Sequence, residues 1–230
     1  MSLQAVLFDL DGTLVDTAVI TEQALRAAFE RARLDVDPPV EAFGELAGRS
    51  LEDIFALLEL PAELALHFRS AATTMVADTR LFPGAEELLL DLRTRGVKIG
   101  VITGKERLRT VAIMEHLGIA AVVQALVCCD DEPAAKPSPE GVHRLLSDLR
   151  VSCGAAVLVG DAPADLLSGR SAGVRTVACS WGIGKPEALA RYDPWRTVTT
   201  VEELARLLRR LIGSSSRPAC EAGQERIGDF

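Results

Sequence analysis

Short apolar segments alternate with amphipathic segments through most of the C-terminal part of the chain. The apolar runs predict β-strands at residues 3–10, 97–103, 125–129, 155–161 and 176–180. Segments with helical periodicity lie between and after them, at residues 84–95, 107–117, 140–149, 164–172 and 201–211. Near-continuous apolar strands separated by helices are typical of a parallel sheet covered on both faces. We therefore expect an α/β fold.

The segment that follows the first strand has a different pattern of apolar and polar residues. It predicts only helices, at residues 17–33, 40–47, 50–58 and 61–77. We therefore expect a sheet domain built from residues 1–15 and 81–212, with an α-helical domain of residues 16–80 inserted after its first strand. Residues 213–230 are rich in small and polar side chains and predict a flexible C-terminal tail.

The composition narrows the class of protein. The chain has 230 residues, 48% of them hydrophobic, and a formal net charge of -8. This is too apolar for a disordered chain and too acidic for nucleic-acid binding. Five cysteines, an odd number, argue against a secreted disulfide scaffold. No signal peptide or membrane span is visible, so we expect a cytoplasmic protein whose partner is a small molecule; the oligomeric state, monomer or dimer, stays open.

Two carboxylates leave the end of the first strand together. Asp9 and Asp11 stand two positions apart, and Gly12 allows the chain to turn sharply after them. Such a pair can divide the work of a nucleophile and an acid/base. A solvated acidic turn is the alternative, but Asp9 sits in an apolar strand end, where an unpaired carboxylate is costly.

A second acidic site follows the strand at 155–161. Asp161 ends that strand, and Asp165 lies one helical turn further on, so both can face one point above the sheet. Together with Asp9 they form an all-oxygen ligand set, which suits Mg²⁺. The alternative for Asp165 alone is a helix N-terminal cap.

Two further segments offer groups that bind phosphate. Lys136 is followed by two prolines within three residues, so it is a positioned cation. Thr103, Gly104 and Lys105 end one strand and open a helix, where a hydroxyl and free backbone N–H groups bind anions.

The order of these elements resembles the haloacid dehalogenase (HAD) superfamily over residues 3–211. The sequence F-D-L-D-G-T-L is similar to its first motif, and Thr103, Lys136 and G-D-x-x-x-D stand where the second, third and fourth motifs belong. The insert resembles the cap of the phosphoglycolate phosphatase and β-phosphoglucomutase branch. The resemblance implies a Rossmann-like core and a phosphoric monoester hydrolase acting on a small phosphorylated metabolite, such as phosphoglycolate or a sugar phosphate.

The resemblance also implies a role for individual residues. Asp9 would attack phosphorus and form an aspartyl-phosphate, and Asp11 would protonate the leaving oxygen and then activate water. Mg²⁺ would be held by Asp9, the backbone carbonyl of Asp11 and Asp161, with Asp165 direct or through water.

The phosphoryl oxygens would be bound by side chains and backbone outside the metal site. Thr103 and Lys136 are implied for this role, with Gly12 and Gly104 beside them. Gly104 replaces a residue that is often Asn or Ser in the family, so Lys105 or a backbone amide would substitute for the missing donor. Arg49, at a turn in the insert, is a candidate contact to the substrate.

Narrower and competing interpretations remain. The T-G-K, G-D-A-x-x-D-L and W-G-x-G variants are similar to phosphatase-like proteins of 3-amino-5-hydroxybenzoate synthesis in ansamycin-type antibiotic pathways. A phosphomutase of the β-phosphoglucomutase type would use the same Asp9, although the insert contains no lysine. A catalytically silent binding protein on the same fold is a third possibility, because fold does not imply function.

Overall fold

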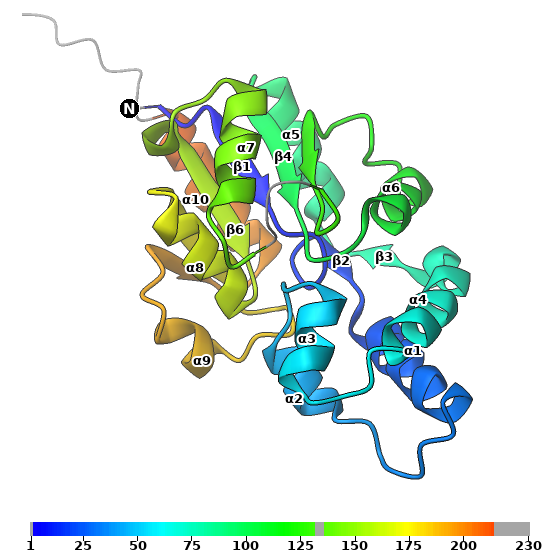
Figure 1. Ribbon diagram of the computed structural model, residues 1–230. Helices are drawn as coiled ribbons and strands as arrows, with labels where there is room; N and C mark the ends of the chain where they lie inside the picture. Colours follow the sequence, from blue (N-terminus) through cyan, green and yellow to red (C-terminus); the bar gives the residue numbers. More distant parts are fainter. Residues whose placement is uncertain (1, 132–135, 214–230) are drawn as a thin grey trace, which may run out of the picture.

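A six-stranded parallel sheet forms the centre of the larger part of the molecule (Figure 1). The computed structural model describes residues 2–131 and 136–213. The strands are β1 (Ala5–Phe8), β4 (Lys98–Ile102), β5 (Ala125–Val127), β6 (Ala156–Gly160), β7 (Arg175–Cys179) and β8 (Arg196–Val198). Their order in the sheet is β5-β4-β1-β6-β7-β8, and every neighbouring pair is parallel. The predicted α/β fold is therefore confirmed.

Helices cover both faces of this sheet. They are α5 (Ala85–Thr94), α6 (Arg107–His116), α7 (Glu140–Leu149), α8 (Pro163–Ser171), α9 (Pro186–Ala190) and α10 (Val201–Gly213). Alternate side chains of β1 point to opposite faces. Val6 and Phe8 pack in one hydrophobic cluster with α5 and α10, whereas Ala5 and Leu7 pack in another with α7.

The helical insertion lies between β2 (Val15–Asp16) and β3 (Arg80–Leu81), which pair as a short antiparallel ribbon. Figure 1 shows its helices gathered at one end of the sheet. They are α1 (Ala18–Arg31), α2 (Val40–Glu45), α3 (Leu51–Leu57) and α4 (Leu64–Thr74), followed by the 3-10 turn Val76–Asp78. Their apolar side chains form a separate hydrophobic cluster. This separation supports our proposed division into a core, 1–15 and 81–212, and an inserted domain, 16–80.

Four short elements were not predicted from the sequence. The strands β2 and β3 have two residues each, and β8 has three, of which two are exposed. The helix α9 has five residues. Elements this short show no period of hydrophobicity. The predicted tail at 213–230 lies outside the described residues except for Gly213, which ends α10. Within the described residues, no helix is long and apolar enough to cross a membrane.

Candidate active site

The loops after several strands meet at one edge of the sheet. Asp9 follows β1, Thr103 follows β4, and Asp161 follows β6. The carboxyl ends of parallel strands lie at the same edge, which is where ligands bind in open α/β sheets. Lys136 reaches this edge from the segment before α7. The residues predicted separately along the chain are therefore brought together.

Lys136 is the buried centre of this group. Its Nζ donates hydrogen bonds to Asp9 Oδ1 at 2.7 Å, to Asp165 Oδ1 at 2.6 Å and to the backbone carbonyl of Ile102 at 3.1 Å. Lys136 is 1% exposed, Asp9 2% and Asp165 0%. Burial favours the neutral amine, but the two carboxylates outweigh it and raise the pKa of Lys136. The side chain is therefore a fixed cation between two buried carboxyl groups.

Asp161 is held by two donors. Thr13 Oγ1 donates to Asp161 Oδ1 at 2.9 Å, and the backbone N–H of Ile183 donates to Oδ2 at 2.8 Å. Burial, and after it the charge of Asp165, raises the pKa of Asp161 to about 7. Neither donor was identified from the sequence. Thr13 could have been identified, because it belongs to the D-x-D-G-T segment. Ile183 could not, because it contributes only its backbone N–H.

Asp165 combines two of the roles considered from the sequence. Its Oδ2 accepts a hydrogen bond from the backbone N–H of Ala162 at 2.9 Å, at the start of α8, while Oδ1 accepts from Lys136. The carboxylate therefore caps the N-terminus of α8 and still faces the site. These two hydrogen bonds fix the orientation of the carboxylate.

Three carboxylates are grouped closely enough to hold a metal ion. Asp9, Asp161 and Asp165 each offer one oxygen, and these oxygens all lie within 4.8 Å of one another. Burial is the largest influence on Asp9 and raises its pKa well above the usual range, although Lys136 opposes it. A Cβ at Gly12, where φ is +77°, would lie 2.1 Å from Asp161 Oδ2. Only glycine therefore permits this approach.

Asp11 does not join that cluster through its side chain. Lys105 Nζ lies 3.1 Å from Asp11 Oδ2, and Asp11 Oδ1 is a buried oxygen without a hydrogen-bond partner among the described residues. Burial would raise the pKa of Asp11, but the charges of Lys105 and Arg109 outweigh it and lower the pKa. The sequence left open whether Lys105 contacts substrate, and did not identify its pairing with Asp11.

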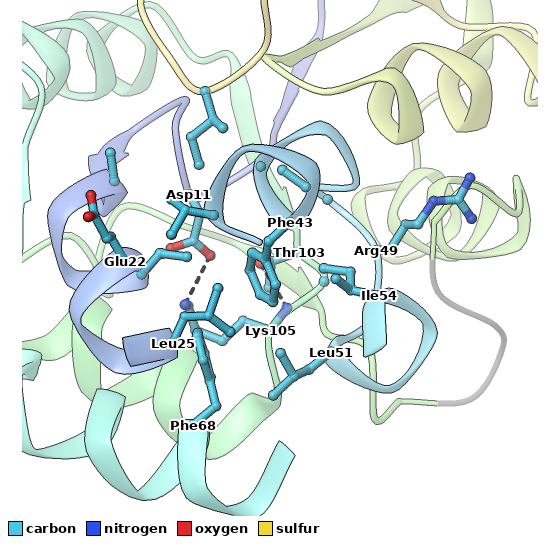
Figure 2. A pocket seen from close by; sticks show the side chains of 18 of the residues that line it. Asp11, Glu22, Leu25, Phe43, Arg49, Leu51, Ile54, Phe68, Thr103 and Lys105 are labelled. Carbon is cyan, nitrogen blue, oxygen red and sulfur yellow. Dashed lines mark hydrogen bonds and ion pairs between the residues drawn. The ribbon is translucent and has the colours of Figure 1, made fainter. Parts of the chain in front are cut away.

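A cavity of about 280 Å³ lies between the insertion and the core, with Asp9, Asp11, Thr103 and Lys105 in its lining. We call it the insertion–core cavity. Figure 2 shows Asp11 and Lys105 beside a group of apolar side chains from the insertion. Its volume is near the lower end of the range for small-molecule sites, about 300–1,000 Å³. The carboxyl groups of Asp9 and Asp11 thus lie next to a space for a small ligand.

A turn of the insertion lies close against the core backbone at Gly104. A Cβ at Gly104 would lie 2.1 Å from the backbone carbonyl oxygen of Arg49 and 2.8 Å from that of Gly48. This contact explains why a glycine follows Thr103. Figure 2 shows the side chain of Arg49 extending away from the other labelled side chains, so its backbone, rather than its guanidinium, is what approaches the core.

A family model described as haloacid dehalogenase-like hydrolase matches residues 6–179. This chain belongs to that family. The match spans β1 to β7 and includes both the helical insertion and all the acidic residues of the site.

Three similar proteins illustrate the family. A phosphoglycolate phosphatase of Rhodospirillum rubrum is 33% identical, over 85% of this chain and 89% of its own length. An N-acetylmuramic acid 6-phosphate phosphatase of Pseudomonas aeruginosa is 34% identical, over 81% and 86% respectively. The solved structure of a hydrolase of the haloacid dehalogenase-like family from Streptococcus pneumoniae superimposes with a TM-score of 0.78 at 25% identity, covering 89% of this chain and 98% of that one.

Replacing Lys136 tests the electrostatics of the buried cluster. We expect Lys136→Met to lower the free energy of unfolding by about 3–5 kcal/mol in metal-free buffer, because Asp9 and Asp165 lose their buried counter-charge. Urea unfolding measures this change. Lys98→Met is the control, since Lys98 is half-buried and bonds only a backbone carbonyl. An equal loss in both variants would contradict the account.

A side chain at position 104 should separate the insertion from the core. We expect Gly104→Ser to cost about 1–3 kcal/mol through overpacking against the carbonyl of Arg49, and to increase hydrogen exchange around residues 48–51. Gly213→Ser is the matched control, because a Cβ there meets nothing within 4 Å. Unchanged exchange in the Gly104 variant would refute the close contact.

Mg²⁺ should stabilise the folded chain through the carboxylate cluster. At about 100 times its Kd, an ion that binds only the folded state adds about 2.7 kcal/mol, which corresponds to roughly 5–10 °C in Tm for a chain of this size. We expect Asp161→Asn to remove most of that shift, whereas Asp148→Asn, at an exposed ion pair on α7, retains it. Thermal unfolding with and without Mg²⁺ measures both; a full shift in Asp161→Asn would contradict the assigned ligands.

Proposed function

We propose that this protein is a Mg²⁺-dependent phosphatase that hydrolyses the phosphomonoester of a small metabolite through an aspartyl-phosphate on Asp9. One observation carries the proposal: Asp9 and Asp11 line the same cavity, one beside a cluster of metal-type ligands and the other beside a lysine. Membership of the hydrolase family and the phosphatase activities named for two relatives support it.

Asp9 is the proposed nucleophile. One of its carboxylate oxygens forms a bond to phosphorus, the bond between phosphorus and the ester oxygen breaks, and the alcohol leaves. Water then attacks the phosphorus of the aspartyl-phosphate, and the carboxylate is released with inorganic phosphate. The hydrogen bond from Lys136 to Oδ1 fixes the orientation of the attacking group.

Asp11 is the proposed acid and base. It would give a proton to the leaving alcohol and later take one from the attacking water. Lys105 lies 3.1 Å away and favours the ionised form, which suits the second step. In the first step a phosphoryl group in the cavity competes for the charge of Lys105, which frees Asp11 to hold a proton.

The carboxylate cluster fits Mg²⁺. Its donors are all oxygens, as Mg²⁺ prefers, and their spread is close to the span of about 4.2 Å between opposite ligands of that ion. Asp9, Asp161 and Asp165 would hold it, together with the backbone carbonyl of Asp11. When bound, the ion supplies positive charge that offsets the repulsion between Asp9 and the phosphoryl oxygens.

The remaining site residues bind and enclose the substrate in this proposal. Thr103 and the backbone at Gly104 would contact phosphoryl oxygens, and Gly12 lets the loop pass beside Asp161. Lys136 was predicted to bind phosphate, but its three donors are taken by Asp9, Asp165 and the carbonyl of Ile102, so it would act on the phosphoryl group through its charge. The insertion would act as a cap that limits the access of bulk water to the cavity, and it lies against the core backbone at Gly104. Arg49 would reach the substrate only after its side chain turns toward the cavity.

The identity of the metabolite is a separate question. The two relatives are named for phosphoglycolate and for N-acetylmuramic acid 6-phosphate, which share a phosphomonoester and a carboxylate but differ in size and shape. The phosphomonoester, on which a phosphatase acts, is the basis of the proposal. The similarity to proteins of 3-amino-5-hydroxybenzoate pathways rests on short sequence variants and stays a prediction, to which these relatives add no support.

Phosphate release in Mg²⁺ and in EDTA tests the proposal. With a reactive ester such as p-nitrophenyl phosphate, we expect release that requires Mg²⁺ and falls about a thousandfold or more in Asp9→Asn, because the nucleophile is lost. Asp11→Asn should lower the rate by about 10²–10⁴, and Asp148→Asn should leave it unchanged.

The outcome also separates the alternatives. Release that survives in Asp9→Asn would refute the assigned nucleophile. Transfer of the phosphoryl group back to substrate, without release of inorganic phosphate, would point to a phosphomutase. Neither release nor transfer from any phosphate ester would favour the silent binding protein.

A further inference from the structure

One wall of the insertion–core cavity is apolar. The side chains that form it come from α1 to α4 of the insertion and, in one case, from the loop before α9; they are Leu25, Phe43, Leu51, Ile54, Phe68 and Ile183. Figure 2 shows Leu25, Phe43, Leu51, Ile54 and Phe68 gathered around the side chain of Lys105. The lining also includes Asp9, Asp11 and Thr103. The cavity thus combines the proposed reacting groups with an apolar wall.

The apolar wall is a face of the insertion's own hydrophobic cluster. Phe43 stacks on Phe68 with ring centroids 5.6 Å apart, and Phe55 completes the group at 5.8 Å and 6.4 Å from these rings. Phe43 and Phe68 line the cavity, whereas Phe55 does not. Apolar cavities of about 150 Å³ bind molecules the size of benzene. A cavity of about 280 Å³ has room for such a group and a phosphoryl group beside it.

Most charged side chains in the lining are paired within the protein: Lys105 with Asp11, Arg109 with Glu106 and Glu22 with Arg26. Arg49 also lines the cavity and forms no ion pair among the described residues, but its side chain extends away from the labelled apolar side chains in Figure 2. A substrate carboxylate at the apolar wall would have to displace one of the paired groups or draw in the side chain of Arg49. The hydroxyl groups of a sugar ring placed against this wall would lose their hydration without gaining hydrogen bonds, which is costly.

We propose, building on the phosphatase function above, that the substrate is the phosphomonoester of an alcohol with a compact apolar body, either a ring or a branched chain. The phosphoryl group lies at Asp9, and the body lies against Phe43, Leu51 and Ile54. The insertion selects the substrate mainly by excluding water from this wall.

Two phosphonates that cannot be hydrolysed at phosphorus test the preference directly. Benzylphosphonate and phosphonoacetate share a methylene phosphonate group and differ in carrying a phenyl ring or a carboxylate. Calorimetry with the wild-type protein in Mg²⁺ should give at least about tenfold tighter binding of benzylphosphonate, since filling an apolar pocket discriminates by that order. Equal or tighter binding of phosphonoacetate would overturn the proposal.

A matched pair of variants locates the effect. Phe43→Leu and Phe55→Leu make the same change in the same aromatic group, but only Phe43 lines the cavity. We expect Phe43→Leu to weaken benzylphosphonate binding about three- to tenfold and to leave phosphonoacetate unchanged, whereas Phe55→Leu affects neither. If Phe43→Leu does not fold, Ile183→Ala makes the same test from the core side. Equal effects at positions 43 and 55 would refute the assigned wall.

Phosphate release separates this inference from the function on which it rests. Benzyl phosphate, glucose 6-phosphate and phosphoglycolate form the panel, and benzyl phosphate should have the highest kcat/KM by about tenfold or more. A preference for either of the other two, with normal Mg²⁺ dependence, would refute the apolar substrate and leave the phosphatase function intact. Tight benzylphosphonate binding with no release from any ester would support the apolar wall and refute the phosphatase function.

Discussion

The buried ion triad of Asp9, Lys136 and Asp165 is the interaction on which the site depends. Asp9 and Asp161 converge because parallel strands end at one edge, and Asp165 joins them from the first turn of α8; burial alone would make that convergence unfavourable. Lys136 offsets this cost through hydrogen bonds of 2.7 Å to Asp9 and 2.6 Å to Asp165. The cluster that results is buried and polar, which is the environment in which electrostatic stabilisation is largest.

The helical insertion supplies the second half of the arrangement. It is tethered by the short β2–β3 ribbon, and its turn at Gly48 and Arg49 rests on the backbone of Gly104. The contact requires glycine on the core side, so the sequences of the two parts are matched at this point. In the proposed function, the core supplies the reacting groups, and the insertion sets the shape and polarity of the cavity beside them. On this proposal, changes in the insertion would alter the substrate without disturbing Asp9.

The sequence predicted the parallel sheet and the convergence of Asp9, Asp161 and Lys136, because period and strand ends are local signals. It did not predict contacts that depend on tertiary distance. The pairing of Lys105 with Asp11 and the direction of the Arg49 side chain are of this kind. The sequence also did not predict the apolar wall. Helical periodicity identifies the side chains that are buried, but it does not tell which of them line a cavity and which pack against one another.

Direct detection of the phosphorylated residue tests the central claim most closely. The protein is mixed with a phosphate ester in Mg²⁺, quenched during turnover and reduced with borohydride, which converts an aspartyl-phosphate to homoserine. Peptide mass mapping should find homoserine at position 9, and not when Mg²⁺ is replaced by EDTA. Homoserine at Asp11 or Asp161, or unmodified peptide throughout active turnover, would contradict the account.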